Sequence, residues 1–584
     1  MKGLGRIPIY SIFLFGIVIA PLNVFLVGWY QNADELELQN ILIPSYTSHS
    51  PIIISNNMDF NTQGWSGNGS ESHPFVIEDL IITNSSICIA ISDTDVYFKI
   101  RNCFISAAEE SSNDGIVFSN VKNGTVKDCI VKLHNNGINI VDSSSCNLMN
   151  NSVIDNKRDG ISLSHSTLCN LSENFALGNR FYGYAVSQSS SCLLTNNTAT
   201  NNAQYGFSGF SIWKSSSCIL TKNIATDNAF YGFEISYSIS CVFTENKLVA
   251  NGLNLDGDSV LHWLHNISDN LVNDQTLGYF MSINNTQIDG TQYGQIILAN
   301  CTNVIVRNGI IIDASVGIRL GFCTNCALTN NIANSNSRYG YWIYYSSFCT
   351  LTNNTSTNNW IGFYLWQCNS CTLVNNTSID ISLGFYPYKT SYCYFKQNSV
   401  RYSTDGFFLH DSSNCTLVEN VFSENEHYGL HIYSSSDCIM TRNIAYDNQY
   451  GIHVDTGCTD NIFYLNRIRN NLAYDGYDNG LSNRWDNGTQ GNYWGSYDGN
   501  GIYLIPGSAG SIDHYPYLFA TSSTSMKPTS TNTNSRSTVV STSANSINSS
   551  TTPNQIPGIP IEIVVVTFAV LMILCLVVIA IKRR

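Results

Sequence analysis

"SSSCILTKN" (residues 215–223) is a polar stretch with one central cysteine, and near copies of it occur elsewhere in the chain. "SSSCLLTNN" covers residues 189–197, and "SSFCTLTNN" covers residues 346–354. In each copy an asparagine follows the cysteine by five residues. This recurrence indicates an internal repeat, and the period of a repeat is the strongest guide to the fold class.

The repeat extends over most of the chain. Eleven cysteines occur in two runs at intervals of 22 to 26 residues, and each is followed by an asparagine five residues later. A glycine follows 13 or 14 residues after every one of these cysteines except Cys241. The cysteines are Cys146, Cys169, Cys192, Cys218, Cys241, Cys326, Cys349, Cys371, Cys393, Cys415 and Cys438. The asparagines are Asn151, Asn174, Asn197, Asn223, Asn246, Asn331, Asn354, Asn376, Asn398, Asn420 and Asn443.

Each repeat shows the alternation of short strands. In residues 450–457, Ile452 and Val454 alternate with His453 and Asp455. A period of two indicates a strand, and 22–23 residues are too few for two helices and their turns. The pattern therefore predicts an all-β parallel β-helix whose coils stack about 4.8 Å apart. The leucine-rich repeat needs a Leu/Asn consensus that this chain does not carry.

The two repeated columns have structural interpretations. We expect the asparagines to occupy left-handed turn positions and to form a ladder of amide hydrogen bonds from coil to coil. The cysteines suit a tight, apolar corner as buried, reduced thiols. Parallel side chains one coil apart are poorly placed for disulfides, although off-column pairs, Cys323 with Cys301 or Cys368, and metal binding remain alternatives.

Composition limits the possible partners. The chain has 584 residues, a net charge of −14 and only 12% charged residues. No basic patch is present to neutralise phosphates, so we expect no nucleic-acid partner. N-x-S/T motifs suit a glycosylated, exported body, among them those that begin at Asn68, Asn84, Asn123, Asn266, Asn284, Asn353, Asn414 and Asn487.

The ends of the chain predict a membrane protein. Residues 7–29 carry no charge and indicate a signal peptide or a signal anchor. Nineteen apolar residues, 563–581, precede a basic end and indicate a transmembrane helix with the body extracellular. The expected organisation is a signal or anchor (1–30), a linker (31–50), a first β-helix half (51–250), an irregular insertion (251–300), a second half with a C-terminal cap (301–519), a Ser/Thr/Asn-rich stalk (520–562), a transmembrane helix (563–581) and a cytoplasmic tail (582–584).

Aromatic residues mark the outward positions of the second half. They lie two and four residues after the repeat glycine, where the first half carries small or polar residues. Rings with polar edges suit sugar faces or a protein partner, and stacking between coils is the structural alternative. The residues we predict to bind a ligand are Trp342, Tyr344, Tyr364, Trp366, Tyr386 and Tyr388. The same columns continue through Phe408, His410, His431, Tyr433, His453 and Asp455. We call these twelve residues the outer strip.

The outer strip ends in a group of titratable residues. His410, His431, His453 and Asp455 are the candidates for a catalytic role, and His431 and His453 are the candidates for a metal site. The two candidate metal ligands share a column about one coil spacing apart. His453 and Asp455 can also act together in acid/base chemistry. Solvated surface histidines are the alternative, and no cofactor is predicted.

Residues 51–518 resemble a known repeat family. The cysteine columns, the block "GQIILANCTNVIVRN" (294–308) and the ending "NRWDNGTQGNYWGSYDGNG" (483–501) are similar to NosD-like, carbohydrate-binding/sugar-hydrolase (CASH) repeats of archaeal surface proteins. The resemblance implies a right-handed β-helix. It implies function less sharply, because NosD proteins are linked to copper-centre maturation while related helices include lyases, epimerases and structural spikes.

The expected function is binding and display at the cell surface, with a glycan or a surface protein as the partner and the membrane as the anchor. One alternative is a carbohydrate-active enzyme, either a polysaccharide lyase or a glycoside hydrolase. We favour it less, because such β-helix enzymes need clustered carboxylates that the sequence does not show. The other alternative is copper delivery, for which only seven methionines and no His-rich motif are available.

Overall fold

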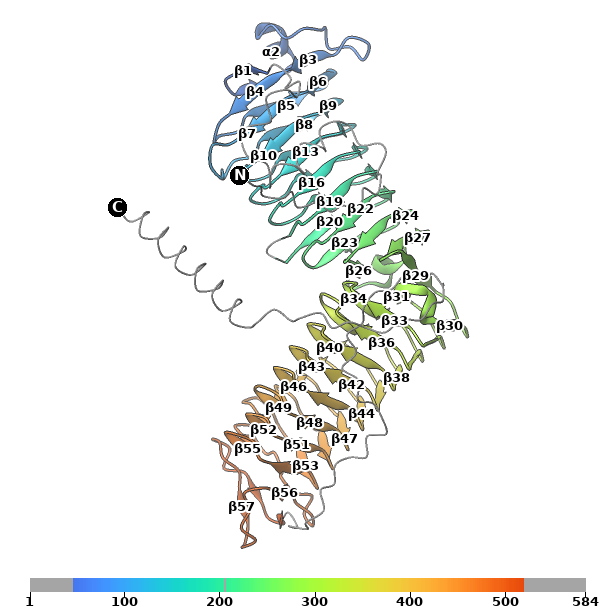
Figure 1. The fold of residues 1–584 in the computed structure, drawn as a ribbon, viewed down its shortest axis with the longest axis vertical. Helices are drawn as coiled ribbons and strands as arrows, with labels where there is room; N and C mark the ends of the chain where they lie inside the picture. Colours follow the sequence, from blue (N-terminus) through green and yellow to red (C-terminus); the bar gives the residue numbers. More distant parts are fainter. Residues whose placement is uncertain (1–45, 204–205, 519–584) are drawn as a thin grey trace, which may run out of the picture. The chain divides into compact units, whose positions relative to one another are not determined.

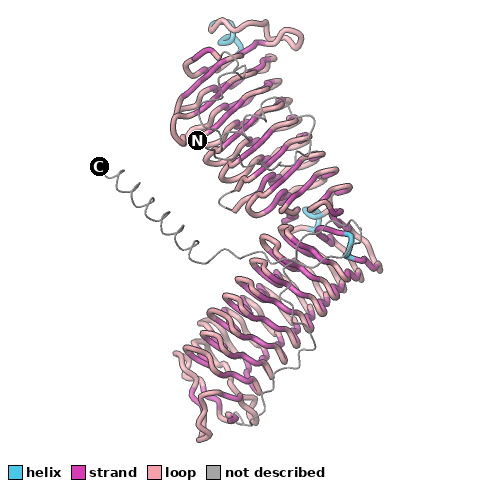
Figure 2. Tube along the Cα trace, in the orientation of Figure 1, coloured by secondary structure: helices cyan, strands magenta, loops and turns pink. Residues whose placement is uncertain are grey.

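The computed structural model describes residues 46–203 and 206–518, and they form a parallel β-helix (Figure 1). Each coil consists of short strands joined by tight turns (Figure 2). One coil contains β18 (Leu193–Thr195), β19 (Thr198–Thr200) and β20 (Ser208–Trp213). Each strand pairs in parallel with its counterpart one coil later, for example Leu194 with Leu220 and Phe210 with Phe233. The predicted all-β parallel β-helix is therefore confirmed.

The core is a continuous column of apolar side chains inside the coils. Leu194 and Leu220 are fully buried, as are Phe210 and Phe233, which stack on each other with ring centroids 4.3 Å apart. Stacking of identical positions follows from the in-register pairing, because each side chain lies directly above its equivalent in the previous coil. The constant period of the sequence is thus the circumference of one coil.

The cysteine columns lie inside this core. All eighteen cysteines among the described residues are buried and free. The thiol of Cys218 contacts the carbonyl oxygen of Ser216 at 3.6 Å, at the corner that leads into β21 (Ile219–Thr221). None of the described cysteines forms a disulfide, including Cys301, Cys323 and Cys368.

Burial should make these thiols unreactive in the folded protein. Burial raises the pKa of Cys88 and of Cys458 to about 11, and a thiol with a raised pKa is a poor nucleophile. Of the 19 cysteines in the chain, we expect at most one to react quickly with Ellman's reagent before unfolding, and all 19 in guanidinium chloride. Rapid reaction of several thiols in the folded protein would contradict this packing.

The asparagine column forms the predicted ladder. The side-chain oxygen of Asn174 accepts from the backbone N–H of Asn151 at 3.0 Å and from its side-chain nitrogen at 2.9 Å. The side-chain nitrogen of Asn174 donates to the carbonyl oxygen of Leu148 and to the side chain of Asn197, both at 2.9 Å. Each asparagine therefore satisfies buried backbone groups at a corner where the strands cannot do so.

One detail of the predicted turn is wrong. The residue with positive φ is the one before the ladder asparagine, such as Lys222 with φ 57° before Asn223. The left-handed residue points its side chain to solvent, which leaves the next side chain free to turn inward and bond. A second amide ladder, which the sequence analysis missed, runs through Asn156, Asn179, Asn202, Asn228 and Asn251.

Between the two halves the strand order changes. In the described residues one 20-stranded sheet passes from β25 (Lys247–Val249) through β28 (Leu271–Val272) to β29 (Gln275–Met281) and then to β31 (Tyr293–Ala299). The β28–β29 pair is antiparallel, unlike the coils on either side. The neighbouring sheet of the first half instead ends at β26 (Leu253–Asp256), so its last strand faces the second half.

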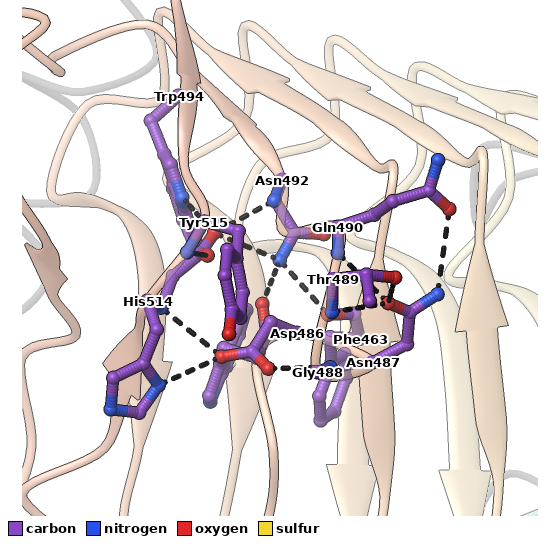
Figure 3. A network of polar contacts seen from close by, with 12 residues as sticks. Phe463, Asp486, Asn487, Gly488, Thr489, Gln490, Asn492, Trp494, His514 and Tyr515 are labelled. Atoms are coloured by element: carbon purple, nitrogen blue, oxygen red, sulfur yellow. Dashed lines mark hydrogen bonds and ion pairs between the residues drawn. The ribbon is translucent and has the colours of Figure 1, made fainter.

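The C-terminal end is closed by buried acids and tryptophans. Asp513 is fully buried and accepts from Trp494 Nε1 at 2.8 Å, and Asp478 accepts from Trp485 Nε1 at 2.9 Å. Figure 3 shows the neighbouring contact between His514 and Asp486, whose atoms Nδ1 and Oδ2 lie 2.9 Å apart. These contacts close the C-terminal end of the last coil, where Trp485 and Trp494 are fully buried.

The membrane predictions concern the ends of the chain. Within residues 46–203 and 206–518, no helix has the length and apolarity needed to span a bilayer. The predicted signal or anchor (1–30), the stalk (520–562) and the transmembrane helix (563–581) lie outside the described residues.

Candidate functional site

The outer strip lies on the longest strands of the second half. Alternation turns Phe363 and Phe407 into the core, where both are fully buried, and turns the outer strip to the other face. The strands that carry it are β37 (Tyr339–Tyr344), β40 (Ile361–Trp366), β43 (Leu383–Tyr388), β46 (Asp405–His410), β49 (Tyr428–Tyr433) and β52 (Tyr450–Val454). In-register pairing then places the outward side chains in continuous columns.

The rings of one column stack on each other. The centroids of Tyr364 and Tyr386 are 5.1 Å apart, those of Tyr386 and Phe408 are 5.2 Å apart, and those of Phe408 and His431 are 4.5 Å apart. All three pairs are within 9° of parallel. The column is therefore a stabilising stack from Tyr364 to His431, as the structural alternative predicted, and it ends where His453 meets His431 edge to face with centroids 5.5 Å apart.

Exposure differs along the outer strip. The expectation of exposed rings is wrong for Trp342, Tyr344 and Tyr364, which are only 6%, 6% and 5% accessible. They lie next to the junction, by which we mean the place where the strand order changes between the two halves of the β-helix. There Arg319 covers Trp342, with its guanidinium carbon 3.5 Å from the ring centroid. Trp366, Tyr386 and Tyr388 are partly buried and retain an accessible edge.

Three of the four titratable candidates converge. Nε2 of His431 lies 2.6 Å from Oδ2 of Asp455, and Nε2 of His453 lies 3.2 Å from Oδ1 of the same carboxylate. The three ligand atoms are all within 4.8 Å of one another. We call His431, His453 and Asp455 the His–Asp cluster. It arises because in-register pairing stacks the two histidines and Asp455 directly follows the strand of the second.

The His–Asp cluster is half-buried among tyrosines. The His431 and His453 side chains are 13% and 11% exposed, and that of Asp455 is 28% exposed. The ring of Tyr428 stacks on His431 with centroids 4.3 Å apart, and that of Tyr477 stacks on His453 at 4.9 Å. Burial lowers the pKa of His453, which favours the neutral imidazole that a metal requires.

His410 is not part of this cluster. Its Nδ1 lies 3.0 Å from the hydroxyl of Tyr386, and its Nε2 lies 3.7 Å from the carboxylate of Asp411. Burial lowers the pKa of His410 as well. These contacts hold the His410 ring against Tyr386 and Phe408, and its nitrogens are not among the converging ligand atoms.

Sequence reasoning missed the residues that surround the cluster. Tyr428 and Tyr477 supply its walls: Tyr428 lies outside the two outward columns, and Tyr477 continues the column of His453 one coil beyond the last member of the outer strip. Asp405 is a further neighbour, and burial raises the pKa of its carboxyl group. The sequence signal for Tyr428 and Asp405 is the position one residue before each repeat glycine. In the second half this position is occupied by Tyr339, Asp405, Tyr428 and Tyr450, among others.

A protein-family comparison identifies the repeat. The model of the NosD family, described as periplasmic copper-binding protein, matches residues 82–276, 280–401 and 361–499. The chain belongs to the NosD family. The resemblance predicted from the cysteine columns is thereby confirmed.

Comparisons of this NosD-family protein with other proteins extend only to the fold. No curated protein sequence matches it. The Dettilon tailspike protein is 13% identical, with 62% of each chain covered and a TM-score of 0.25. A mutant of the periplasmic alginate epimerase AlgG is 12% identical over 65% of this chain and 77% of that one, with a TM-score of 0.26. A GH87 α-1,3-glucanase from Streptomyces thermodiastaticus is 12% identical over 55% and 66%, with a TM-score of 0.27.

The His–Asp cluster can act chemically in two ways. Two imidazole nitrogens and a carboxylate oxygen are the donor set of many transition-metal sites. A histidine held by a carboxylate can also transfer protons. Glycoside hydrolysis by the common two-carboxylate route would need a pair of acids facing the substrate; the cluster holds one, Asp455, and the neighbouring Asp405 is paired with His427 at 3.6 Å. The geometry therefore favours metal binding.

Proposed function

We propose that this NosD-family protein binds a divalent transition-metal ion, Cu²⁺ in preference to Zn²⁺, at the His–Asp cluster. The observation that carries the proposal is the convergence of three ligand atoms, which lie within 4.8 Å of one another in two adjacent coils. Only small shifts are needed to bring all three onto one ion. The description of the NosD family as copper-binding supports the same assignment.

The choice of copper follows from the ligands. Imidazole and carboxylate groups suit Cu²⁺ and Zn²⁺, and the affinity of such a mixed site is highest for Cu²⁺ in the divalent series. Asp455 is the most accessible member of the cluster and opens the site to ions from solvent. Tyr428 stacks on the imidazole of His431, and Tyr477 stacks on that of His453. Each tyrosine holds its imidazole in orientation.

We place this binding site outside the cell on a membrane-anchored rod. The supports are the uncharged N-terminal segment (7–29), the apolar C-terminal segment (563–581) with its basic end, and a family described as periplasmic. The Ser/Thr/Asn-rich stalk (520–562) separates the β-helix from the membrane in this arrangement.

Metal titration of the full chain tests the proposal. The protein is stripped with a chelator and titrated separately with Cu²⁺ and Zn²⁺ by calorimetry, and the copper form is examined by electron paramagnetic resonance. We expect a single high-affinity equivalent of Cu²⁺, tighter than Zn²⁺, whose spectrum shows coupling to two nitrogens. Weak, unsaturated copper binding without nitrogen coupling would overturn the assignment.

Glycan or surface-protein binding by the accessible part of the outer strip is a second candidate. Trp366 and Tyr388 keep accessible edges, and Tyr433 is 40% exposed. The rings of Trp366 and Tyr388 meet edge to face with centroids 5.1 Å apart. Adjacent, differently tilted rings with polar edges suit the faces of successive sugars.

A glycan array compares the Trp366→Ala/Tyr388→Ala variant with wild type. We expect the double variant to lose most binding, because both ring faces are removed while the buried rings stay in place. Tyr394→Ala is the matched control, since Tyr394 is a similarly accessible ring on a strand of another sheet. Equal binding by wild type and the double variant would remove the outer strip from the binding function.

A further inference from the structure

One coil at the junction lacks a strand. In the next coil β32 (Ile305–Arg307) is followed by β33 (Ile310–Ile312). In the coil before it, β30 (Gln287–Asp289) leads through the short 3₁₀ helix η3 (Gly290–Gln292) directly into β31, with no strand in between. Among the described residues, β33 is therefore the first strand of its sheet and pairs on one side only, with β36 (Ile332–Asn334) (Figure 1).

The open side of β33 presents backbone groups without partners. The N–H of Ile332 donates to the carbonyl of Gly309 at 2.7 Å, and in a parallel ladder successive residues of a strand face opposite neighbours. Ile311 therefore faces β36, while Ile310 and Ile312 face the open side. Among the described residues, the N–H and the carbonyl of Ile310 and the N–H of Ile312 have no hydrogen-bond partner.

A hollow of about 400 Å³ lies along this open edge. Asn273 and Gln275 of the β28–β29 hairpin line it, together with Thr291 of η3 and with Ile310 and Ile312. Its volume is within the range of about 300–1,000 Å³ that is usual for binding sites. The side-chain nitrogen of Asn273 donates to the carbonyl of Ile312 at 2.9 Å, which shows that a polar group can bind this edge from the hollow.

We propose that the open edge of β33 binds an extended peptide segment of a partner protein, which adds to the sheet as one more strand. Free N–H and carbonyl groups on an edge strand are a template for strand pairing. Here they follow in the order donor, acceptor, donor, which the main chain of an extended peptide complements. In this mode of recognition the main-chain hydrogen bonds supply affinity and the side chains supply specificity.

The side chains at the edge select an apolar peptide with a basic residue. The side chains of Ile310 and Ile312 are 53% and 43% exposed and lie on the same face of the strand, where β-branched residues of an added strand would pack beside them. Asp313 directly follows β33 and is exposed, and no lining residue of the hollow is a lysine or an arginine. A lysine in the peptide therefore gains a nearby carboxylate, whereas a glutamate is repelled.

The same charges favour a partner protein over a second copy of this chain. The chain has a net charge of −14, so two copies repel each other at an acidic edge. Sedimentation velocity of the full chain without peptide should therefore show no self-association that depends on this edge. A dimer that the peptide dissociates would make a second copy the occupant and overturn the assignment to a partner.

Calorimetric titration of the full chain with the blocked peptide Thr-Val-Thr-Val-Lys tests the proposal. Two further peptides carry backbone N-methyl groups on one or the other set of alternate residues. An added strand uses the N–H groups of one set only, so one methylated peptide should bind at least about tenfold more weakly than the other. Replacing lysine by glutamate should weaken binding about threefold or more. No saturable binding of the first peptide, or equal binding of the two methylated peptides, overturns the proposal.

Variants of the protein locate the binding edge. Ile310→Pro removes a free N–H that the ladder does not use, and proline is tolerated at such edge positions. It should weaken peptide binding at least about tenfold, while Ile310→Val, which keeps the N–H, should bind like wild type. Unchanged affinity in a folded Ile310→Pro protein would refute the site.

A charge variant decides the case if Ile310→Pro does not fold. Asp313→Asn should weaken binding of the lysine peptide about threefold and remove the preference for lysine over glutamate. The matched control is Asp380→Asn, because Asp380 is an exposed aspartate with the same backbone φ of 56° beside a strand that has neighbours on both sides. Equal effects of the two substitutions, or no effect of Asp313→Asn, would also refute the site.

Discussion

His431→Ala should weaken Cu²⁺ binding by at least about 100-fold, because it removes one of two nitrogen ligands from a three-ligand site. His453→Ala should have a similar effect, and the double variant should show only non-specific binding. Both histidines stack on tyrosines, so each alanine also removes ring packing. Circular dichroism and thermal melts without metal must therefore show an intact fold before affinities are compared.

The matched control is His427→Ala. His427 lies in the coil of His431, its side chain is 54% exposed, and its nearest carboxylate is Asp405 at 3.6 Å. Its loss should leave copper affinity and the nitrogen couplings unchanged. If His427→Ala and His431→Ala reduce affinity equally, copper binds to surface histidines in general and the His–Asp cluster is not the site.

Asn174→Leu should destabilise the β-helix by about 2–6 kcal/mol, because it leaves two buried backbone groups without partners. These groups are the N–H of Asn151, now bonded at 3.0 Å, and the carbonyl of Leu148, now bonded at 2.9 Å. Leucine has the same number and branching of side-chain heavy atoms as asparagine but no hydrogen-bonding group, so it fills the position without replacing the amide contacts. Urea unfolding followed by circular dichroism measures the loss.

Glu173→Gly is the control for this ladder variant. Glu173 is the exposed neighbour with φ 57°, a conformation that glycine adopts without strain. Its substitution should change the free energy of unfolding by less than about 1 kcal/mol. A loss for Asn174→Leu no larger than that of the control would show that the amide ladder contributes little to stability.

The sequence predicted the ladder well because its cause is local and repeated. Every coil has the same backbone corner, so an asparagine at the same position, such as Asn174 or Asn197, forms the same hydrogen bonds to buried backbone groups in each coil. The misplaced left-handed residue has a physical reason too. Asparagine is favoured at such turns in general, but here its side chain is needed inside, and Lys222 and its equivalents take the strained backbone conformation.

Prediction of the candidate site was less complete. Alternation correctly turned Trp342, Tyr364 and His431 away from the core, and the coil period correctly placed His431 one coil spacing from His453. Neither rule says how much of an outward residue a distant segment covers. Trp342 is buried because Arg319 and the junction cover it, and those contacts have no period that a sequence can show.

The sequence by itself determined the β-helix, its coil length and the columns of cysteine and asparagine, because each coil contacts its neighbours at equivalent positions and periodicity along the chain becomes periodicity in space. Only the tertiary structure decided which outward residues meet. The convergence of two imidazoles on Asp455 depends on side-chain rotamers, and the enclosure of Arg319 beside Trp342 depends on where one sheet ends and another continues. Both arise where the repeat changes, so the repeat could not predict them.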